Sequence, residues 1–410
     1  MTRVSLALAL ALLAPACDSS PAGGGGDGGN CQPTMCAPPP DLSCGAACAP
    51  ADMTMACGAA CADMTCGAAC ADMACASGCG SADLACPGSS CGGSMVNLCS
   101  DSANCGACNH DCGGGACVAS VCQGVAVDTM QVSPWGVAVD ANNVYWTDIN
   151  TGSTDGTVMQ QAKSGGAATA LAQMQWAPHD LLVNATGLYW ENYSAGEIWK
   201  IAPLGATAVN VTTEPAQMVS FTVDGTNAYF VEKGSSVVRK APLAGGAASS
   251  TPLTTPTAGR SPGSLIADGS FVYWVNTVDG SIFATTPDGT TTTTLVPTAG
   301  AGALALYSGD LYFSTSSEIR KVSTSAGGAP AVVVHGIAAG LTEMIVDAGG
   351  VYWTNNAAGT VERAGFSDGV PHTIGANQKH PIGIAADATT IYWAASGTGA
   401  NDGQIMRAVK

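Results

Sequence analysis

The sequence has no cysteine after Cys122. All nineteen cysteines lie between Cys17 and Cys122. It also has no lysine or arginine between Arg3 and Lys163, and charged residues make up only 10% of the chain. With a formal net charge of −17, such a surface repels nucleic acid and anionic membranes, so neither is expected as a partner. Residues 123–410 have no cross-links and must fold around an ordinary hydrophobic core.

Long apolar runs are also missing. The longest candidate, Val4 to Leu13, has about half of the roughly 20 residues that a membrane-spanning helix needs. It follows Arg3 and precedes Ala14-Pro15-Ala16, a small-x-small cleavage signature, so residues 1–16 are predicted to be a signal peptide. The chain is therefore expected outside the cytoplasm, as a surface-anchored or secreted protein.

The position of Cys17, directly after this signature, resembles the lipid-attachment cysteine of bacterial lipoproteins. The resemblance implies that Cys17 becomes the lipidated N-terminus of a cell-surface or outer-membrane protein, with membrane contact only through that lipid. One departure is Ala14, where the lipoprotein family prefers leucine. Two alternatives stay open: cleavage that leaves Cys17 as the first residue of a secreted protein, and retention of the apolar segment as an anchor.

The cysteine content divides the N-terminal part. Residues 17–43 form a Gly/Pro-rich tether that cannot bury enough apolar surface to fold alone. Residues 44–84 are degenerate repeats of Cys-Gly-Ala-Ala-Cys, each followed by Ala-Asp-Met. Since only cross-links can order such an exported segment, these cysteines are interpreted as disulfides. Zinc held at Cys105–Cys108, and copper held by the methionines of the repeats, are the alternatives.

Residues 85–122 are predicted to be a small disulfide module. The run Asn104-Cys105-Gly106-Ala107-Cys108 resembles a cysteine-rich module of secreted myxobacterial proteins, similar to plant Stig1-like domains. Met95 stands where that family has a cysteine, and Cys99 is extra, so the family's bridge pattern is not carried over. The disulfide candidates are Cys86, Cys91, Cys99, Cys105, Cys108, Cys112, Cys117 and Cys122.

Residues 123–410 contain an internal repeat marked by a pair of aromatic residues. The pairs start at intervals of 44, 40, 44, 39, 40 and 40 residues. They are Tyr145-Trp146, Tyr189-Trp190, Tyr229-Phe230, Tyr273-Trp274, Tyr312-Phe313, Tyr352-Trp353 and Tyr392-Trp393. A period near forty residues with an aromatic signature is typical of a solenoid or a propeller.

Each repeat has a β pattern. In the first copy, Gly136–Val139 and Val144–Thr147 are predicted strands around a turn, and two further strands follow before the next copy. Four short strands per repeat form a propeller blade. The seventh copy stops after its third strand, and Val127–Trp135 parallels Leu171–Pro178, the end of the first copy. The fold class is therefore all-β, a seven-bladed β-propeller in which an N-terminal strand completes the last blade and removes the open edges.

The blade sequence resembles the YWTD β-propellers of lipoprotein-receptor type. Tyr145-Trp146-Thr147-Asp148 matches the motif that gives these repeats their name, and Tyr352-Trp353-Thr354-Asn355 nearly does. Those receptor propellers have six blades, whereas seven copies are counted here. The resemblance implies the design of the blade and protein binding as a function, but not a specific partner.

Three sets of residues are weighed as sites. The first is the aspartates that start the turns, as calcium ligands or turn caps: Asp140, Asp224, Asp268, Asp347 and Asp387. The second is a basic residue in the third strands, as an anion-binding band or as solvated side chains: Lys200, Arg239, Lys321, Arg363 and Arg407. The third is His372 and His380 with Glu362, which are of interest because bacterial seven-bladed lyases that open cyclic peptide antibiotics have His and Glu at a metal centre.

The interpretation favoured by these patterns is a binding or structural protein, not an enzyme. No residue is predicted to be catalytic, to bind a cofactor or to bind a metal. The aromatic pairs are expected to pack between blades. The partner is expected to be a protein or a glycan, and the chain to be a monomer. The alternative is a metal-dependent propeller lyase or hydrolase, which should have at least two histidines and a carboxylate in the central pocket.

Overall fold

The computed structural model describes residues 89–410, except 151, 153, 245–249, 326–327 and 400. These residues all belong to the second of two compact units, 80–410. The predicted signal, tether and repeats, with Cys17 and Cys86, lie outside the described residues. Within the described part, no helix is long and apolar enough to cross a membrane.

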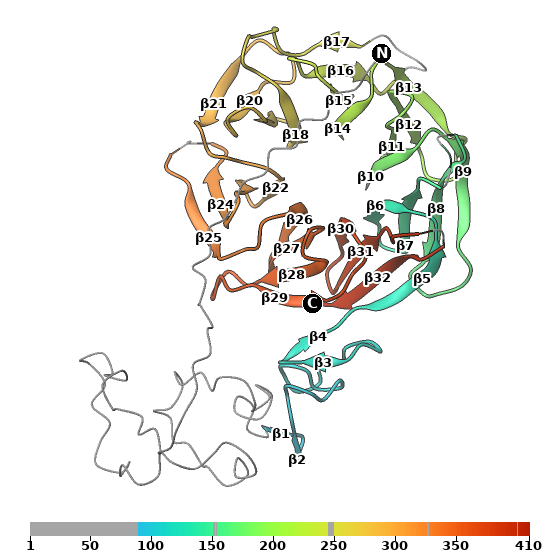
Figure 1. The fold of residues 1–410 in the computed structure, drawn as a ribbon, viewed down its shortest axis with the longest axis vertical. Coiled ribbons are helices and arrows are strands. Elements are labelled where there is room, and N and C mark those ends of the chain that lie inside the picture. The colour runs from blue at the N-terminus through green and yellow to red at the C-terminus, as the bar shows by residue number, and fades with distance from the viewer. Residues whose placement is uncertain (1–88, 151, 153, 245–249, 326–327, 400) are drawn as a thin grey trace, which may run out of the picture. The chain divides into compact units, whose positions relative to one another are not determined.

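Seven four-stranded antiparallel sheets form a ring, so the predicted seven-bladed propeller is confirmed (Figure 1). Blade 1 is β6 (Pro134–Val139), β7 (Asn143–Asp148), β8 (Gly156–Ala162) and β9 (Thr169–Gln175). Blade 2 is β10 (Pro178–Asn184), β11 (Gly187–Asn192), β12 (Glu197–Ile201) and β13 (Val209–Thr213). Blade 3 is β14 (Met218–Val223), β15 (Asn227–Glu232), β16 (Arg239–Pro242) and β17 (Thr251–Pro252). Blade 4 is β18 (Pro262–Ala267), β19 (Val272–Asn276), β20 (Ile282–Thr285) and β21 (Thr292–Val296).

The other blades follow the same order from the channel outward. Blade 5 is β22 (Leu304–Tyr307), β23 (Asp310–Ser314), β24 (Glu318–Ser323) and β25 (Ala331–His335). Blade 6 is β26 (Leu341–Asp347), β27 (Gly350–Asn355), β28 (Thr360–Ala364) and β29 (His372–Gly375). Blade 7 is β30 (Pro381–Ala386), β31 (Thr390–Ala395), β32 (Gly403–Val409) and β5 (Val125–Gln131).

The N-terminal strand closes the ring as predicted. β5 pairs antiparallel with β32, and the register runs from Gln131 opposite Gly403 to Val125 opposite Arg407. In Figure 1 the two strands lie side by side at the point where the first and last blades meet. The edge of β32 is therefore covered by a strand that lies almost 280 residues earlier in the chain.

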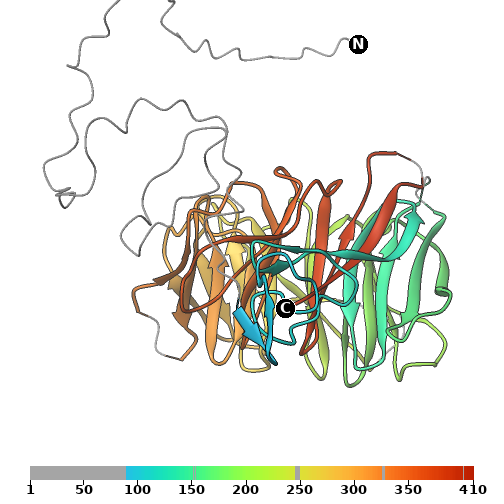
Figure 2. The same ribbon diagram turned by 90° about the horizontal axis from the view of Figure 1, so that it is seen from below.

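The strands run between two faces of the ring (Figure 2). We call the face at which the inner strands begin the mouth face; it also carries the loops between second and third strands. We call the opposite face the turn face, because it carries the turns between first and second strands and between third and fourth strands. These names follow from the antiparallel order within each sheet.

The aromatic pair explains the packing between blades. Neighbouring residues of a strand point to opposite faces of its sheet, so the tyrosine faces the next blade and the second aromatic residue faces the previous one. One buried cluster, for example, holds Tyr145 of blade 1 with Trp190 of blade 2, and another holds Tyr392 of blade 7 with Trp146 of blade 1. All seven interfaces contain such a pair. The regular repeat of the aromatic pair is therefore the repeat of one interface.

The cysteine-rich segment is built from two short hairpins, β1 (Ser89–Cys91) with β2 (Ser94–Val96) and β3 (Cys117–Val118) with β4 (Val121–Cys122). Three disulfides join Cys91 to Cys108, Cys105 to Cys117 and Cys112 to Cys122, and Cys99 is also disulfide-bonded. The disulfides at Cys105 and Cys108 favour the disulfide interpretation over the zinc alternative. The disulfides indicate an oxidising, extracytoplasmic compartment.

The end of this segment is part of the propeller core. Val121 is only 6% exposed and belongs to the buried cluster that contains Tyr352 and Trp393. Gly124 donates its N–H to the carbonyl of Ile374, and a Cβ at Gly124 would overlap the Trp393 ring. Glycine is therefore required where the chain passes from the cysteine-rich segment into β5.

Candidate functional site

Seven residues occupy equivalent positions on the inner strands, and five of them line the channel. In each blade, one residue of the inner strand lies opposite the second residue of the aromatic pair in the strand register. The residue just before it is the one meant here: Gly136 precedes Val137, which lies opposite Trp146. The same register defines the other members, so the channel ring is Gly136, Asp180, Ser220, Ser264, Ala303, Glu343 and Gly383. Five positions are small, and two carry carboxylates.

The channel encloses a cavity of about 560 Å³, lined by inner strands of all seven blades. Its described lining is mostly aliphatic and contains Asp180 and Glu343 but no lysine, arginine or histidine. Asp180 belongs to blade 2 and Glu343 to blade 6, so the two side chains come from opposite sides of the ring. The cavity is therefore an acidic chamber with apolar walls.

Burial makes ionisation of these two carboxyl groups unfavourable. It raises the pKa of Asp180 to about 6. It also raises the pKa of Glu343 well above its usual range, and the charge of Asp180 adds to this effect. One hydrogen bond opposes the shift, because Oε2 of Glu343 accepts the backbone N–H of Ile384 in the next blade at 3.2 Å. Ser220 accepts the equivalent N–H of Leu265 with its hydroxyl at 3.3 Å.

A third acidic residue, Glu191, lies behind the ring in β11. It occupies the position of Thr147 in blade 1, whose hydroxyl accepts the N–H of ring residue Gly136 at 2.9 Å and donates to the carbonyl of His179 in the next blade. Glutamate places a longer, acidic side chain at this position. Glu191 is 1% exposed, and its Oε2 has no hydrogen-bond partner. Burial, and then the charge of Asp180, raise the pKa of Glu191 well above its usual range.

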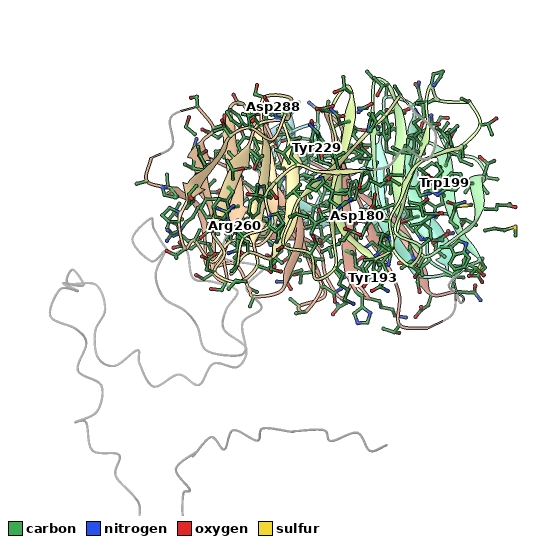
Figure 3. All side chains as sticks on the ribbon, turned by 90° about the horizontal axis from the view of Figure 1, so that it is seen from above. Asp180, Tyr193, Trp199, Tyr229, Arg260 and Asp288 are labelled. Carbon is green, nitrogen blue, oxygen red and sulfur yellow. A yellow bond between two sulfur atoms is a disulfide. The ribbon has the colours of Figure 1, made fainter. Side chains whose placement is uncertain are left out.

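Aromatic side chains gather at the channel mouth. Trp135, which lines the cavity, stacks on His179, and His179 stacks on Tyr193, with 4.4 Å between ring centroids in both pairs. Burial lowers the pKa of His179 to about 4, so the imidazole is neutral at physiological pH. Figure 3 shows Tyr193 near one face of the ring and Asp180 nearer the middle, with Tyr229 and Asp288 toward the opposite face. A ligand that enters from the mouth face meets the stack before the carboxylates.

Trp176 extends this aromatic group on the mouth face. It lies in the connection between blades 1 and 2 and is 48% exposed. Its carbonyl accepts the N–H of Ser194, and the carbonyl of Ala177 accepts the N–H of Tyr193, so the connection is bonded to the loop that carries the stack. We call Trp135, Trp176, His179 and Tyr193 the aromatic rim.

The turn aspartates lie on the opposite face and bond within their own turns. Oδ1 of Asp140, for example, accepts the N–H groups of Asn142 and Asn143 at 2.8 and 2.7 Å. Asp224, Asp268 and Asp387 accept the equivalent pairs, and Asp347 accepts the N–H of Gly349. These contacts favour the interpretation as turn caps over the calcium alternative.

The basic residues of the third strands bond to neighbours. Lys200 donates to the carbonyl of Leu243 in the next blade, Arg239 lies 3.5 Å from Glu214, and Lys321 lies 2.7 Å from Asp310. For Lys200, Arg239 and Lys321, these contacts argue against an anion-binding band, because each basic group already has a partner in the protein.

The histidine candidates are not brought together. His372 begins β29, the outermost strand of blade 6, and its Nε2 lies 3.3 Å from Asp368. His380 lies in the connection before β30, where its Nδ1 contacts the carbonyl of Gly397 at 2.9 Å. Glu362 accepts a hydrogen bond from Thr360. The described lining of the channel includes none of these three residues.

The positive φ of His380 has a structural explanation. Ser133, Ala177 and His380 are equivalent in the connections to blades 1, 2 and 7, and their φ values are 57°, 51° and 54°. The conformation is therefore a property of the connection and does not indicate a metal site.

The repeat pattern of the sequence did not indicate the acidic chamber or the aromatic rim. The signal was a deviation from the repeat: an acid at 180 and 343 where other copies have Gly, Ser or Ala, and an acid at 191 where other copies have Thr, Ser, Val or Ala. It could be found only after the copies were aligned by strand register.

No protein-family model matches the sequence, and no curated protein matches it. Solved structures do match. A streptogramin B lyase is 12% identical over 70% of this chain and 97% of its own, with a TM-score of 0.57. Virginiamycin B lyase from Staphylococcus aureus is 15% identical over 70% of this chain and 98% of its own, with a TM-score of 0.58. A chain of a nidogen/laminin complex is 14% identical over 60% of this chain and 97% of its own, with a TM-score of 0.47. The likeness to the two lyases, at these identities, shows the fold alone.

Proposed function

We propose that this protein is an exported, non-enzymatic binding protein, tethered to the cell surface through a lipid on Cys17, whose propeller engages a protein or a glycan at its mouth face. The observation that carries the proposal is the aromatic rim, a stack of three rings at the entrance of a cavity together with the exposed Trp176, whose backbone is hydrogen-bonded to the loop that carries Tyr193. Large rigid rings offer much contact area and lose little conformational entropy on binding.

The positions of the titratable groups support a binding function. A metal-dependent lyase or hydrolase needs histidines and a carboxylate that converge in one pocket. In the described lining of the cavity the titratable groups are carboxylates, while His372 and His380 lie elsewhere in the fold. The disulfides support export, since they persist in oxidising compartments.

The rim can be tested with variants that keep the fold. The full-length protein is applied to a glycan array and to an extract of the envelope of the producing cells, and saturable binding is measured. Trp176→Ala, at a half-exposed side chain, and Trp135→Ala are expected to weaken binding about tenfold, in the range of hot-spot residues. The control is Phe366→Ala, a 43% exposed aromatic residue of the turn after β28 that lies outside the rim.

Three outcomes contradict the proposal: no saturable binding in either assay, equal binding by all variants, or turnover of a bound ligand that the Trp variants abolish. The anchoring is tested separately by the intact mass of the native protein. A mass that begins at Cys17 and includes acyl chains supports the lipid anchor, and an unmodified N-terminus contradicts it.

A further inference from the structure

The channel contains acidic side chains that no described basic residue pairs with. Asp180 and Glu343 face the cavity, and its described lining has no lysine, arginine or histidine. Basic residues elsewhere pair with acids that do not line the cavity: Lys163 lies 2.6 Å from Asp387, and Lys379 lies 3.1 Å from Asp402. Buried charges are normally paired, because unpaired ions lose their hydration without compensation.

Glu191 gives a second, independent observation. The residue at its position in blades 1 and 6 is a threonine whose hydroxyl bonds the backbone of the next blade, as Thr354 does to the carbonyl of Ile382 at 2.6 Å. Glu191 replaces that bond with a carboxyl group that is almost completely buried and has an unpartnered oxygen. The charge of Asp180 adds to the effect of burial on the pKa of Glu191. Blade 2 therefore has a buried carboxyl group where blades 1 and 6 have a threonine that bonds the backbone of the next blade.

We infer that the channel binds an organic cation, a ligand whose primary ammonium group enters from the mouth face and pairs with Asp180 and Glu343, the two acids that line the cavity. The inference rests on the proposed binding function and specifies the chemistry of its ligand. One ammonium group offers three N–H donors, and charge-assisted bonds to carboxylates are among the strong hydrogen bonds. The ammonium also supplies the positive charge that the chamber lacks.

The geometry favours an organic cation over a metal ion. Calcium needs six to eight oxygen ligands at about 2.3–2.6 Å, which demands carboxylates close to one another. In the described part of the chain, the one group of three potential ligands within 4.8 Å of one another is Cys105, Cys112 and Cys122, which are in disulfides. A cavity of about 560 Å³ lies within the usual range for small-molecule sites. An ammonium group can be held by two carboxylates, whereas calcium needs six to eight oxygen ligands.

The aromatic rim fits the same ligand. Trp135 lines the cavity one residue before the ring level, and His179 is neutral. Lys233 donates to the hydroxyl of Tyr193 at 3.3 Å, at the outer end of the stack. Indole rings attract cations through the negative electrostatic potential of their faces. The alkyl chain of the ligand would contact the aliphatic walls, which include Leu181 and Met344.

The test uses the full-length protein and defined probes. Isothermal titration at pH 8 measures binding of 1,5-diaminopentane, of the peptide acetyl-Gly-Lys-Gly-amide, of the same peptide with an acetylated lysine, and of CaCl2 at matched ionic strength. The expected result is saturable binding of one diamine or lysine peptide per chain, with no binding of the acetylated peptide. Diamine binding alone indicates a free amine as the natural ligand, and peptide binding indicates a lysine side chain of a partner protein.

Isosteric variants locate the site. Asp180→Asn and Glu343→Gln each remove one charge and keep the shape of the side chain, and each is expected to weaken binding about tenfold or more, since hydrogen bonds to charged groups are strong. The matched control is Asp368→Asn, an exposed acid on the outer part of blade 6, which should bind like the unmodified chain. Melting temperatures with and without the probe check that the variants are folded and that the probe stabilises only those that bind it.

Three results overturn the inference: no amine binds, the variants and the control bind equally well, or calcium binds while the amines do not. These results are distinguishable from failure of the proposed function. If Asp180→Asn and Glu343→Gln keep full binding to the array or the extract while Trp176→Ala loses it, the binding function stands and the cation site does not.

Discussion

The phenol of Tyr145 donates a hydrogen bond to Oδ2 of Asp140 at 2.8 Å, and so joins the middle of one strand to the turn that precedes it. Tyr229 with Asp224 and Tyr273 with Asp268 repeat the contact at 2.6 and 2.9 Å. Burial, and then the bond to Asp140, raise the pKa of Tyr145 to about 12, so the phenol remains a donor throughout the physiological range. The tyrosine of the aromatic pair therefore both fills the interface and fixes the turn.

Replacing Tyr229 with phenylalanine should lower the free energy of unfolding by about 1–2 kcal/mol, because the bond to Asp224 is lost while the ring still packs. Urea unfolding measures the change. The matched control is Tyr312→Phe, since the equivalent turn position of blade 5 is Tyr307 and provides no carboxylate. Equal destabilisation by both variants would show that the turn bond contributes nothing.

Replacing Gln175 with alanine should lower the free energy of unfolding by about 1–3 kcal/mol, the usual effect of leaving buried donors unpaired. Oε1 of Gln175 accepts the indole N–H of Trp190 at 2.9 Å and an amide N–H of Asn192 at 3.1 Å. Gln131 and Gln378 accept from Trp146 and Trp393 in the same way. Thermal unfolding compares this variant with Gln173→Ala at an exposed position of the same strand; the idea fails if the control loses as much stability.

Removing β5 should open the ring. A chain that begins at Val132 lacks the strand that pairs with β32, whereas a chain that begins at Gly124 lacks only the cysteine-rich segment and what precedes it. We expect the shorter chain to melt at a lower temperature and to self-associate through the exposed edge of β32, because unpaired edges add strands from other chains. Calorimetry and light scattering make the comparison, and identical behaviour of the two chains would contradict the role of β5.

The disulfide nearest the propeller should stabilise it. Cys122 follows Val121, which is buried against Trp393, so replacing Cys112 and Cys122 together with serine is expected to lower the melting temperature of the propeller itself. The matched control removes the bond between Cys91 and Cys108, which is farther along the chain from the propeller. Removal of a disulfide commonly costs about 2–4 kcal/mol. If the melting temperature of the propeller is the same in both variants, the two parts are thermodynamically independent.

The acid Asp148 should make stability depend on pH. Burial raises its pKa from 3.8 to about 7, although the indole N–H of Trp146 opposes the shift. Between these values the folded protein binds more protons than the unfolded chain, so stability should fall as pH rises from about 4 to about 7, by up to about 4 kcal/mol. His179 contributes the opposite slope between its folded pKa of about 4 and its ordinary value of 6.5.

Substituting Asp148 separates these contributions. In Asp148→Asn the fall in stability toward neutral pH should be smaller, and the variant should be more stable than the unmodified chain at pH 8. Melting temperatures at pH 4.5, 6 and 8 give the comparison, with Asp111→Asn, an exposed acid of the cysteine-rich segment, as the control. An unchanged pH profile in Asp148→Asn would show that this carboxyl group does not titrate across the range.

The sequence by itself determined the blades. The spacing of the aromatic pairs, the turn residues and the β-branched strands are local features, and each copy repeats them because each copy makes the same interface. Closure of the ring also follows from the sequence. The seventh copy lacks its fourth strand, and the segment before the first copy matches that missing strand, so it can pair with the open edge. All of this depends on contacts that recur with the period of the repeat.

The tertiary structure alone decided the acidic chamber. Asp180 and Glu343 belong to blades that are distant in sequence, and what brings them together is the irregular pairing of the inner strands, which turns one residue of each blade toward the channel. Glu191 lies buried in the second strand of the same blade as Asp180. The repeat pattern predicts where each residue lies within its own blade. The acidity of the cavity comes from Asp180 and Glu343, which replace small residues in two different blades. These two residues face one cavity only because the ring closes.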